Sequence, residues 1–254
     1  MIGLFIVIYK YQNILFRNKW INLLFVILYF VLQLIVIHCF MVEPSWDFGE
    51  VYKNAIEFAK SAHPTFGNAY LYMCDNNIIF SVILDCIFKF FYWIGLKDSF
   101  LQIGIGINLI MIDISLIYLY KLLKLIKEEY AKPFILFCMM FSPLLFYLPI
   151  FYTDTITLPF LVIPLYYFYN YFFVKQKVRY IMISGLLLGF GGLLKPTVLI
   201  LLIAVIIFLI LKKEELKRIN YYKMIPILLL LVVIPILGQK VFVNHFFDKS
   251  SLVL

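Results

Sequence analysis

Polar residues interrupt an otherwise hydrophobic pattern in this chain and divide it into apolar runs. A run of about 20 apolar residues is the length that an α-helix needs to cross a bilayer. The runs that the pattern predicts to span are residues 21–41, 102–120, 133–150, 156–174, 180–194, 198–211 and 224–238. We therefore expect an all-α fold, a polytopic membrane helix bundle of about seven spans.

The most polar interruption is the stretch 43–60, which reads EPSWDFGEVYKNAIEFAK. At about 100° per residue, one predicted face is apolar and carries Phe48, Tyr52, Ala55, Ile56 and Ala59. The opposite face carries Asp47, Glu50, Lys53, Asn54, Glu57 and Lys60. This pattern is typical of an amphipathic helix that lies along a membrane surface, with Asp47 in its first turn after Pro44-Ser45. A plainer interpretation is a solvated loop helix whose charges only keep it in water.

Residues 78–96 are long enough to span, but they carry Ser81, Asp85 and Lys89 on one stripe, and charges in a lipid-exposed helix are costly. The basic residues help to decide. If this segment does not span, the N-terminus and the basic clusters at 121–132, 175–179 and 212–223 all become cytoplasmic, as the positive-inside rule requires. We therefore expect residues 42–100 to form an outer loop with interfacial amphipathic helices. The whole of 1–254 is then a single transmembrane module with no soluble domain.

The composition supports a membrane protein and excludes other classes. The 254 residues are 65% hydrophobic and 14% charged, and their mean hydropathy is +1.00, unlike any soluble domain of this length. The net charge of +8 follows from basic cytoplasmic loops, so we expect no nucleic-acid partner. The four cysteines form no CxxC motif, and His38, His63 and His245 are isolated, so their spacing does not indicate a metal site, while a divalent metal stays an open alternative.

Two further polar features are predicted to lie on the same outer face as Asp47. Asp154 lies in the segment FYTDTITLP, residues 151–159, which joins an outward span to an inward one. Lys195 lies in the turn LKPT, residues 194–197, between two later spans. Helix capping by Thr153 or Asp154 would also explain the first feature, and a lysine that snorkels to the interface would explain the second.

Two carboxylates and a cation at one leaflet suit the transfer of a sugar from a lipid phosphate. The acceptor hydroxyl must lose a proton to a base. The departing lipid phosphate is already a stable anion, so it needs a cation and no general acid. One carboxylate would be the base, the second would orient it or hold a divalent metal, and Lys195 would bind the phosphate.

These features resemble the GT-C superfamily of polyprenyl-phosphate-sugar-dependent membrane glycosyltransferases, which includes protein O-mannosyltransferases and lipid A aminoarabinose transferases. The resemblance rests on the cytoplasmic N-terminus, the outer surface helix that begins Trp46-Asp47, the Tyr-Thr-Asp-Thr tip and the Leu-Lys-Pro-Thr turn. It implies that Asp47 is the catalytic aspartate and that Asp154 is its acidic partner. The residues expected to bind substrate are Lys195, Glu50, Tyr152 and His63.

The resemblance also implies a location and partners. The protein is expected to be a multi-pass protein of the cell membrane, surrounded by membrane lipids, with its active face extracytoplasmic. The donor would be a lipid-linked sugar, and the acceptor an envelope polysaccharide, a lipid or a protein. Members of the superfamily usually continue with further spans, and many carry a soluble outer domain. We therefore expect this chain to be an N-terminal portion, a truncated gene, or a half that needs a partner.

Two other functions fit the same pattern of spans. A transporter or lipid flippase would line its path with charges near the middle of the membrane. The candidate charges lie instead at span ends and in surface helices. Asp113 is the exception, and we expect it to make a packed polar contact inside its span. The third alternative is a non-catalytic membrane subunit.

Overall fold

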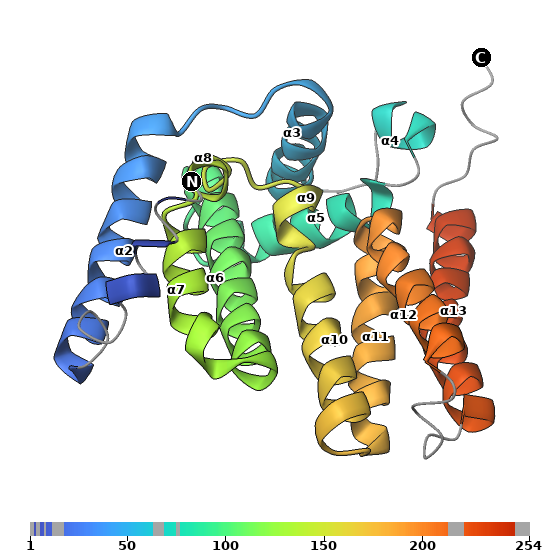
Figure 1. Ribbon diagram of the computed structural model, residues 1–254. Coiled ribbons are helices and arrows are strands. Elements are labelled where there is room, and N and C mark those ends of the chain that lie inside the picture. Colours follow the sequence, from blue (N-terminus) through green and yellow to red (C-terminus); the bar gives the residue numbers. More distant parts are fainter. Residues whose placement is uncertain are drawn as a thin grey trace. The chain divides into compact units, whose positions relative to one another are not determined.

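The computed structural model describes residues 3, 6–7, 9–11, 18–62, 69–74, 77–212 and 221–246, and all regular elements in this part of the chain are helices. Figure 1 shows their arrangement. The first half contains α2 Lys19–Phe40, α3 Trp46–Lys60, α4 Ala69–Met73, α5 Ile78–Trp93, α6 Phe100–Ile126, α7 Glu128–Met139 and α8 Ser142–Phe146. The second half contains α9 Thr153–Ile156, α10 Pro159–Tyr169, the π-helical segment η2 Asn170–Val174, α11 Val178–Leu194, the 3₁₀ segment η3 Pro196–Leu199, α12 Ile200–Leu211 and α13 Tyr221–Phe246. The predicted all-α fold is confirmed.

Four helical segments of the described chain are long and apolar enough to cross a membrane. They are Lys19–Phe40, Phe100–Ile126, Thr153–Val174 and Met224–Val243, and the shorter apolar helices Val178–Leu194 and Pro196–Leu211 accompany them. The protein is therefore a membrane helix bundle. α5, with 16 residues, is not among these segments.

One predicted span is wrong as a continuous helix. The pattern predicts a single helix over residues 133–150, whereas α7 ends at Met139 and the short helix α8 begins at Ser142. Pro143 lies at the start of α8, where a residue without an N–H group fits a helix start and cannot continue a preceding helix. Pro133 lies inside α7 and does not end it. The apolar pattern thus located the helical segment but not the position of its break.

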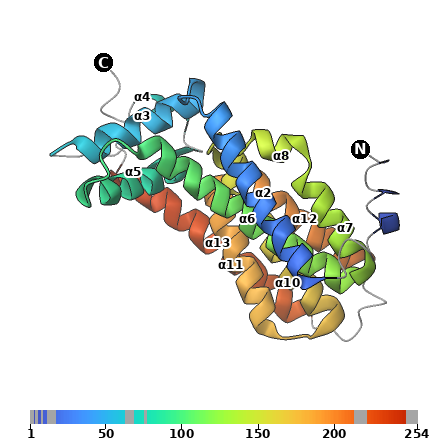
Figure 2. The same cartoon turned by 90° about the vertical axis from the view of Figure 1, so that its left-hand side faces the viewer.

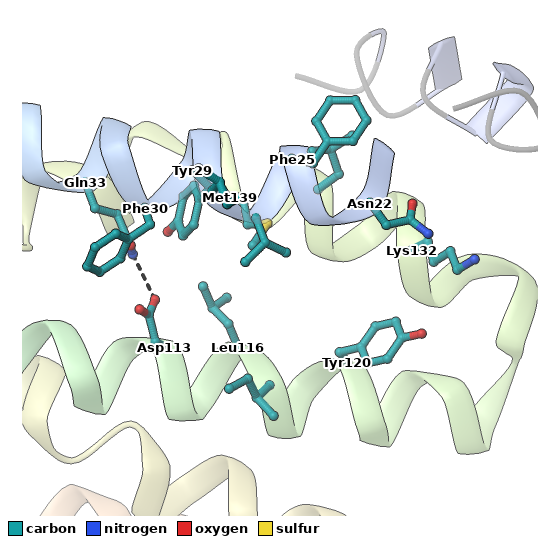
Figure 3. Close-up of a pocket in the computed structure, with 14 residues that line it drawn as sticks. Asn22, Phe25, Tyr29, Phe30, Gln33, Asp113, Leu116, Tyr120, Lys132 and Met139 are labelled. Atoms are coloured by element: carbon teal, nitrogen blue, oxygen red, sulfur yellow. Dashed lines mark hydrogen bonds between the residues drawn. The ribbon is translucent and has the colours of Figure 1, made fainter. Parts of the chain in front are cut away.

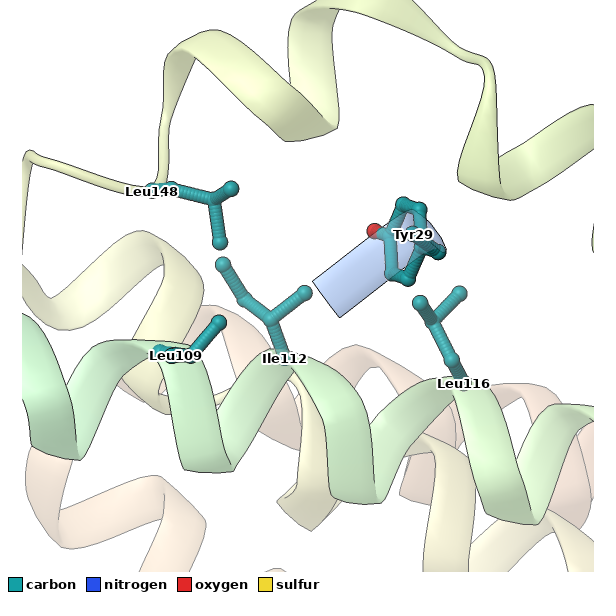
Figure 4. Close-up of a cluster of buried hydrophobic side chains, with 5 residues drawn as sticks. All are labelled: Tyr29, Leu109, Ile112, Leu116 and Leu148. Atoms are coloured by element: carbon teal, nitrogen blue, oxygen red, sulfur yellow. The ribbon is translucent and has the colours of Figure 1, made fainter. Parts of the chain in front are cut away.

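The helices form two compact units. The first consists of Met1–Val42 and Gly104–Val162, and the second of Glu43–Ile103 and Ile163–Leu254. In the first unit, α2, α6 and the α8 region surround a buried cluster, shown in Figure 4. This cluster consists of Tyr29, Leu109, Ile112, Leu116 and Leu148. Asp113 lies inside α6 and accepts a hydrogen bond from Gln33 Nε2 at 2.8 Å, so the packed polar contact predicted for it is confirmed.

In the second unit, α11 packs against α13 through glycines. A Cβ atom on Gly185 would lie 2.9 Å from Leu231 Cβ, and one on Gly189 would lie 2.8 Å from the Leu231 carbonyl oxygen. Only hydrogen fits in these places, so the glycine-rich segment does allow close helix packing. Ser184 Oγ links α11 to α10, because it lies 3.2 Å from the Pro164 carbonyl oxygen and donates within its own helix to Tyr180 O at 2.8 Å.

The helices α3 and α5 form a pair within the second unit. Figures 1 and 2 show this pair at the end of the unit where α11 and α13 finish. The turn that contains Lys195 follows directly after α11, so it lies at the same end. The second unit therefore gathers the surface helix α3 and the Lys195 turn at one end of its apolar helices.

Candidate active site

Asp47 lies in the first turn of α3, as the sequence predicted, and its side chain is exposed. The entry to this helix is tightly constrained. Gly49 donates its backbone N–H to Ser45 O at 3.0 Å, and a Cβ atom on Gly49 would lie 2.9 Å from Pro44 O. Trp46 has a φ of 60° and is the only non-glycine residue with positive φ in the described part of the chain. Such backbone strain is often stored at functional sites, so the start of α3 is a candidate for one.

The polar face predicted for α3 is wrong at one residue. Asn54 was placed among the exposed charges, but its side chain is only 5% exposed. Its Nδ2 donates to Asp85 Oδ1 and to Ser81 Oγ, both at 3.2 Å. Ser81 and Asp85 are both fully buried on α5. Asn54, which its polarity placed on the exposed face, thus joins α3 to α5.

Lys89 completes the contact between α5 and α3. Its Nζ donates to the carbonyl oxygens of Ala59 at 3.1 Å and Ser61 at 2.7 Å. These carbonyls belong to the C-terminal end of α3, where backbone acceptors have no helical partner and a cation is stabilising. The polar stripe of α5 therefore faces α3 and fixes the helix on which Asp47 lies.

Asp85 gives this helix pair a dependence on pH. Burial raises the pKa of Asp85 from 3.8 to about 7, and the hydrogen bond from Asn54 opposes part of that rise. An acid whose pKa is higher in the folded state binds its proton more tightly there. The stabilisation that the proton provides is complete below about pH 4 and is lost as the pH rises through 7, with a size of a few kcal/mol at most.

We expect Asp85→Asn to remove this pH dependence and to raise the unfolding temperature at pH 8 relative to the parent. Asparagine keeps the shape of the carboxyl group but carries no charge that must be buried. Thermal unfolding in detergent at pH 5 and pH 8 measures the effect. Asp98→Asn is the matched control, because Asp98 lies exposed in the turn that follows α5. A parent whose stability does not change between the two pH values would contradict this account of Asp85.

Asp154 lies in the short helix α9 of the first unit and is exposed. The turn before it is held on α6 by Asn108, which is fully buried. Asn108 Nδ2 lies 3.0 Å from Tyr147 O, 2.9 Å from Leu148 O and 3.1 Å from Ile150 O. One amide group thus holds three carbonyls of the turn that leads to Asp154.

A second contact holds the same turn. Phe151 is fully buried, and a Cβ atom on Gly104 would lie 2.4 Å from its ring. The ring therefore packs directly on the backbone of α6, where only glycine leaves space for it. Neither Gly104 nor Asn108 was predicted from the sequence. A polar side chain and a glycine inside a predicted span are the signals that could have indicated them.

The helix-capping alternative for this segment has limited support. Tyr152 precedes α9 and makes no side-chain capping bond. The threonine hydroxyls bond to backbone oxygens, with Thr157 Oγ1 donating to Thr153 O at 2.6 Å and Thr155 Oγ1 lying 3.3 Å from Tyr152 O. The hydroxyls of this segment thus bond to its own backbone, and Asp154 lies exposed within it.

Lys195 lies between α11 and η3 and is half-buried. Its N–H donates to Gly191 O at 2.8 Å, and its carbonyl oxygen accepts from the Val198 N–H at 3.0 Å. A Cβ atom on Gly192 would lie 2.8 Å from Leu199 Cδ2, so the turn closes tightly after the helix. The backbone of Lys195 is therefore fixed on both sides.

The predicted site residues fall into two groups. Asp47, Glu50 and Lys195 belong to the second unit, and Tyr152 and Asp154 belong to the first. Glu50 Oε1 lies 3.9 Å from Lys53 Nζ, and both side chains are exposed. An exposed ion pair of this kind contributes little to stability. His63 lies outside the described residues. No three His, Cys, Asp or Glu side chains gather as a metal site within the described residues.

Comparison with known proteins establishes the class. Residues 83–238, more than half of the chain, match the family model of dolichyl-phosphate-mannose-protein mannosyltransferases. The chain belongs to this family. No curated protein matches the chain. No solved structure matches it either.

Membership makes the protein a membrane glycosyltransferase of the GT-C type. The matched residues include Asp154, Lys195 and the α6 contacts that hold the Asp154 turn, and they begin after Asp47. The GT-C resemblance inferred from the sequence is therefore confirmed at the level of the superfamily. The roles of the individual residues are a separate question.

Proposed function

We propose that this transferase moves a sugar from a polyprenyl-phosphate donor to an acceptor hydroxyl on the extracytoplasmic face of the membrane. The family match supports the class of reaction. The observation that carries the choice of site is the exposed Asp47 in the constrained first turn of α3. The acceptor belongs to the cell envelope and is a polysaccharide, a lipid or a protein.

In the proposed reaction, the Asp47 carboxylate takes the proton of the acceptor hydroxyl. The acceptor oxygen forms a bond to the anomeric carbon of the sugar, and the bond from that carbon to the phosphate oxygen breaks. The lipid phosphate leaves with the electron pair as an anion, so no proton donor is needed. Lys195 Nζ stabilises this anion by a charge-assisted contact.

The remaining predicted residues take supporting roles in this proposal. Asp154 is the acidic partner that the family resemblance implies, and it acts on the acceptor or on a divalent cation from its own turn. Glu50 and Tyr152 contact the sugar or the acceptor. The positions of Glu50 one turn after Asp47 and of Tyr152 directly before α9 support this assignment.

The sidedness of the site rests on the basic residues. With an odd number of spans between them, α3 lies outside and the segment around Lys127 lies in the cytoplasm, as the positive-inside rule favours. We expect a single cysteine at Glu57, which is exposed on α3, to react with an impermeant thiol reagent on intact cells. A single cysteine at Lys127, exposed between α6 and α7, should react only after lysis.

The labelling experiment uses a background in which Cys39, Cys74, Cys86 and Cys138 are replaced. Lysed cells provide the control that both new cysteines are reactive. Labelling of the cysteine at 127 in intact cells would place the basic segment outside. The proposed extracytoplasmic face for Asp47 would then be wrong.

The proposed phosphate contact predicts a loss of donor binding. Lys195→Ala should weaken the binding of a polyprenyl-phosphate sugar by about tenfold or more, because a charge-assisted hydrogen bond contributes roughly 1.5–3 kcal/mol. Titration of the purified protein with donor measures this. Lys97→Ala is the control, because Lys97 is exposed in the predicted outer loop 42–100 and is assigned no contact with the donor. Equal donor affinity in Lys195→Ala and the parent would show that Lys195 is only an interfacial lysine.

A further inference from the structure

A groove runs along the first unit between α2, α6 and α7 (Figure 3). Its volume is about 610 Å³, within the range of sites that hold a small ligand. Its middle part is apolar and includes Phe25, Phe30, Leu116, Leu136 and Met139. None of the residues assigned to sugar transfer lines it, so the groove is a separate feature.

The two ends of the groove differ in chemistry. Figure 3 shows Asn22, Tyr120 and Lys132 at one end, while Gln33 and Asp113 lie toward the other. Gln33 Nε2 donates to Asp113 Oδ1 at 2.8 Å. Tyr29, whose hydroxyl group is buried, lies one helical turn before Gln33 on α2.

The end near Lys132 offers different groups. Lys132 is exposed there and supplies a cation. Asn22 Oδ1 is buried at this end and has no hydrogen-bond partner within the described residues. A buried acceptor of this kind is costly unless a donor reaches it. This end therefore suits a headgroup that carries both a negative charge and a hydroxyl donor.

The length of the groove matches one leaflet of a bilayer. Asn22 and Gln33 are eleven positions apart on α2, which is about 16 Å along a helix axis. The hydrocarbon core of a bilayer is about 30 Å thick. The groove is thus about half as long as this core is thick, which is the depth that an acyl chain of one leaflet occupies.

The chemistry of the groove favours a lipid over a helix of another protein or of a second copy. Its middle part is apolar, and one end offers the cation of Lys132 and the buried acceptor Asn22 Oδ1. An anionic phospholipid carries an apolar chain and a matching headgroup in one molecule.

We propose that this groove binds one anionic phospholipid, with an acyl chain along the apolar part and the phosphate at Lys132. A hydroxyl of the headgroup, such as that of phosphatidylglycerol, donates to Asn22 Oδ1. Lys124 and Lys127 are exposed near this end, but they pair with Glu128 and Glu129. Lys132, which lines the groove, is therefore the cation assigned to the phosphate. The bound lipid joins α2 to α6 and α7.

The test measures lipid retained by the full chain. The protein is purified in mild detergent, incubated with vesicles of phosphatidylglycerol or of phosphatidylcholine, and analysed by native mass spectrometry. We expect about one phosphatidylglycerol per chain, at least tenfold preferred over phosphatidylcholine. Lys132→Ala should reduce this retention by about tenfold. Lys121→Ala should not reduce it, because Lys121 lies over the Tyr118 ring and does not line the groove.

Two variants test whether the acyl chain of the lipid lies in the groove. Ile117 lines the groove from α6 and is 53% exposed, so Ile117→Trp should narrow the groove without disturbing buried packing. Leu136→Trp should narrow the groove from α7. Both should lose the bound lipid while keeping the parent unfolding temperature measured without lipid. Equal retention of the two lipids, undiminished retention in Lys132→Ala, or undiminished retention in a folded tryptophan variant would overturn the proposal. Crosslinking of a photoreactive lipid chain to residues outside the groove would also overturn it.

Discussion

Asp47→Asn is expected to lower sugar transfer by about 10²–10⁴-fold, the usual cost of losing a general base. Asparagine keeps the size of the side chain and most of its hydrogen bonds, but it cannot accept the acceptor proton at neutral pH. Donor binding should persist, because a carboxylate does not favour a nearby anionic phosphate. The measurement is transfer from a polyprenyl-phosphate sugar in membranes that contain the variant at the parent level.

Two further variants make this result specific. Asp98→Asn changes an exposed carboxylate of the same predicted outer loop and should leave transfer unchanged. Asp154→Asn should cost less than Asp47→Asn if Asp154 only orients, and about as much if it helps to hold a metal. Near-normal transfer by Asp47→Asn would show that Asp47 is not the base. Glu50 and Glu57, both exposed on α3, would then be the next candidates.

Gly104→Ala is expected to destabilise the first unit and to reduce transfer. The new Cβ atom would lie 2.4 Å from the Phe151 ring, so the ring and the turn before Asp154 must move. Overpacking of this kind usually costs about 1–3 kcal/mol. Unfolding temperature in detergent measures the destabilisation, and the transfer assay measures the displacement of Asp154.

Gly106→Ala is a matched control on the same helix. A Cβ atom there would meet no atom within 4 Å, and alanine is a better helix former than glycine by about 0.5–1 kcal/mol. We therefore expect unchanged or slightly higher stability and normal transfer. If the two alanine variants behaved alike, the close contact between α6 and Phe151 would not hold the Asp154 turn.

The sequence predicted what depends on long, regular patterns. The apolar runs indicated a membrane helix bundle, because about 20 apolar residues are what a helix needs to cross a bilayer with its backbone groups hydrogen-bonded. Pro44-Ser45 placed Asp47 correctly in the first turn of α3, because start signals are local. A glycine-rich helix such as α11 likewise indicates close packing, because a missing Cβ atom leaves space for whichever helix lies against it.

The sequence failed where the outcome depends on which neighbour a residue meets. Asn54 has the polarity of a surface residue, and only the presence of Asp85 on α5 makes its burial favourable. Asn108 is equally unremarkable in a span until the turn at 147–150 lies against it. The break between α7 and α8 was missed because hydropathy does not record the lost N–H of Pro143. Hydropathy identifies a helix, but the contacts between helices place its polar residues.

Sugar transfer with Asp47 as the base is tested by following the label from donor to acceptor. Membranes with the parent chain, with Asp47→Asn and without the chain are given labelled polyprenyl-phosphate mannose and an envelope acceptor extract. We predict that the parent moves label from lipid to acceptor and releases one polyprenyl phosphate per sugar, and that the variant does not. Label that only crosses the bilayer on its lipid, equally with parent and variant, would contradict the account and indicate a flippase.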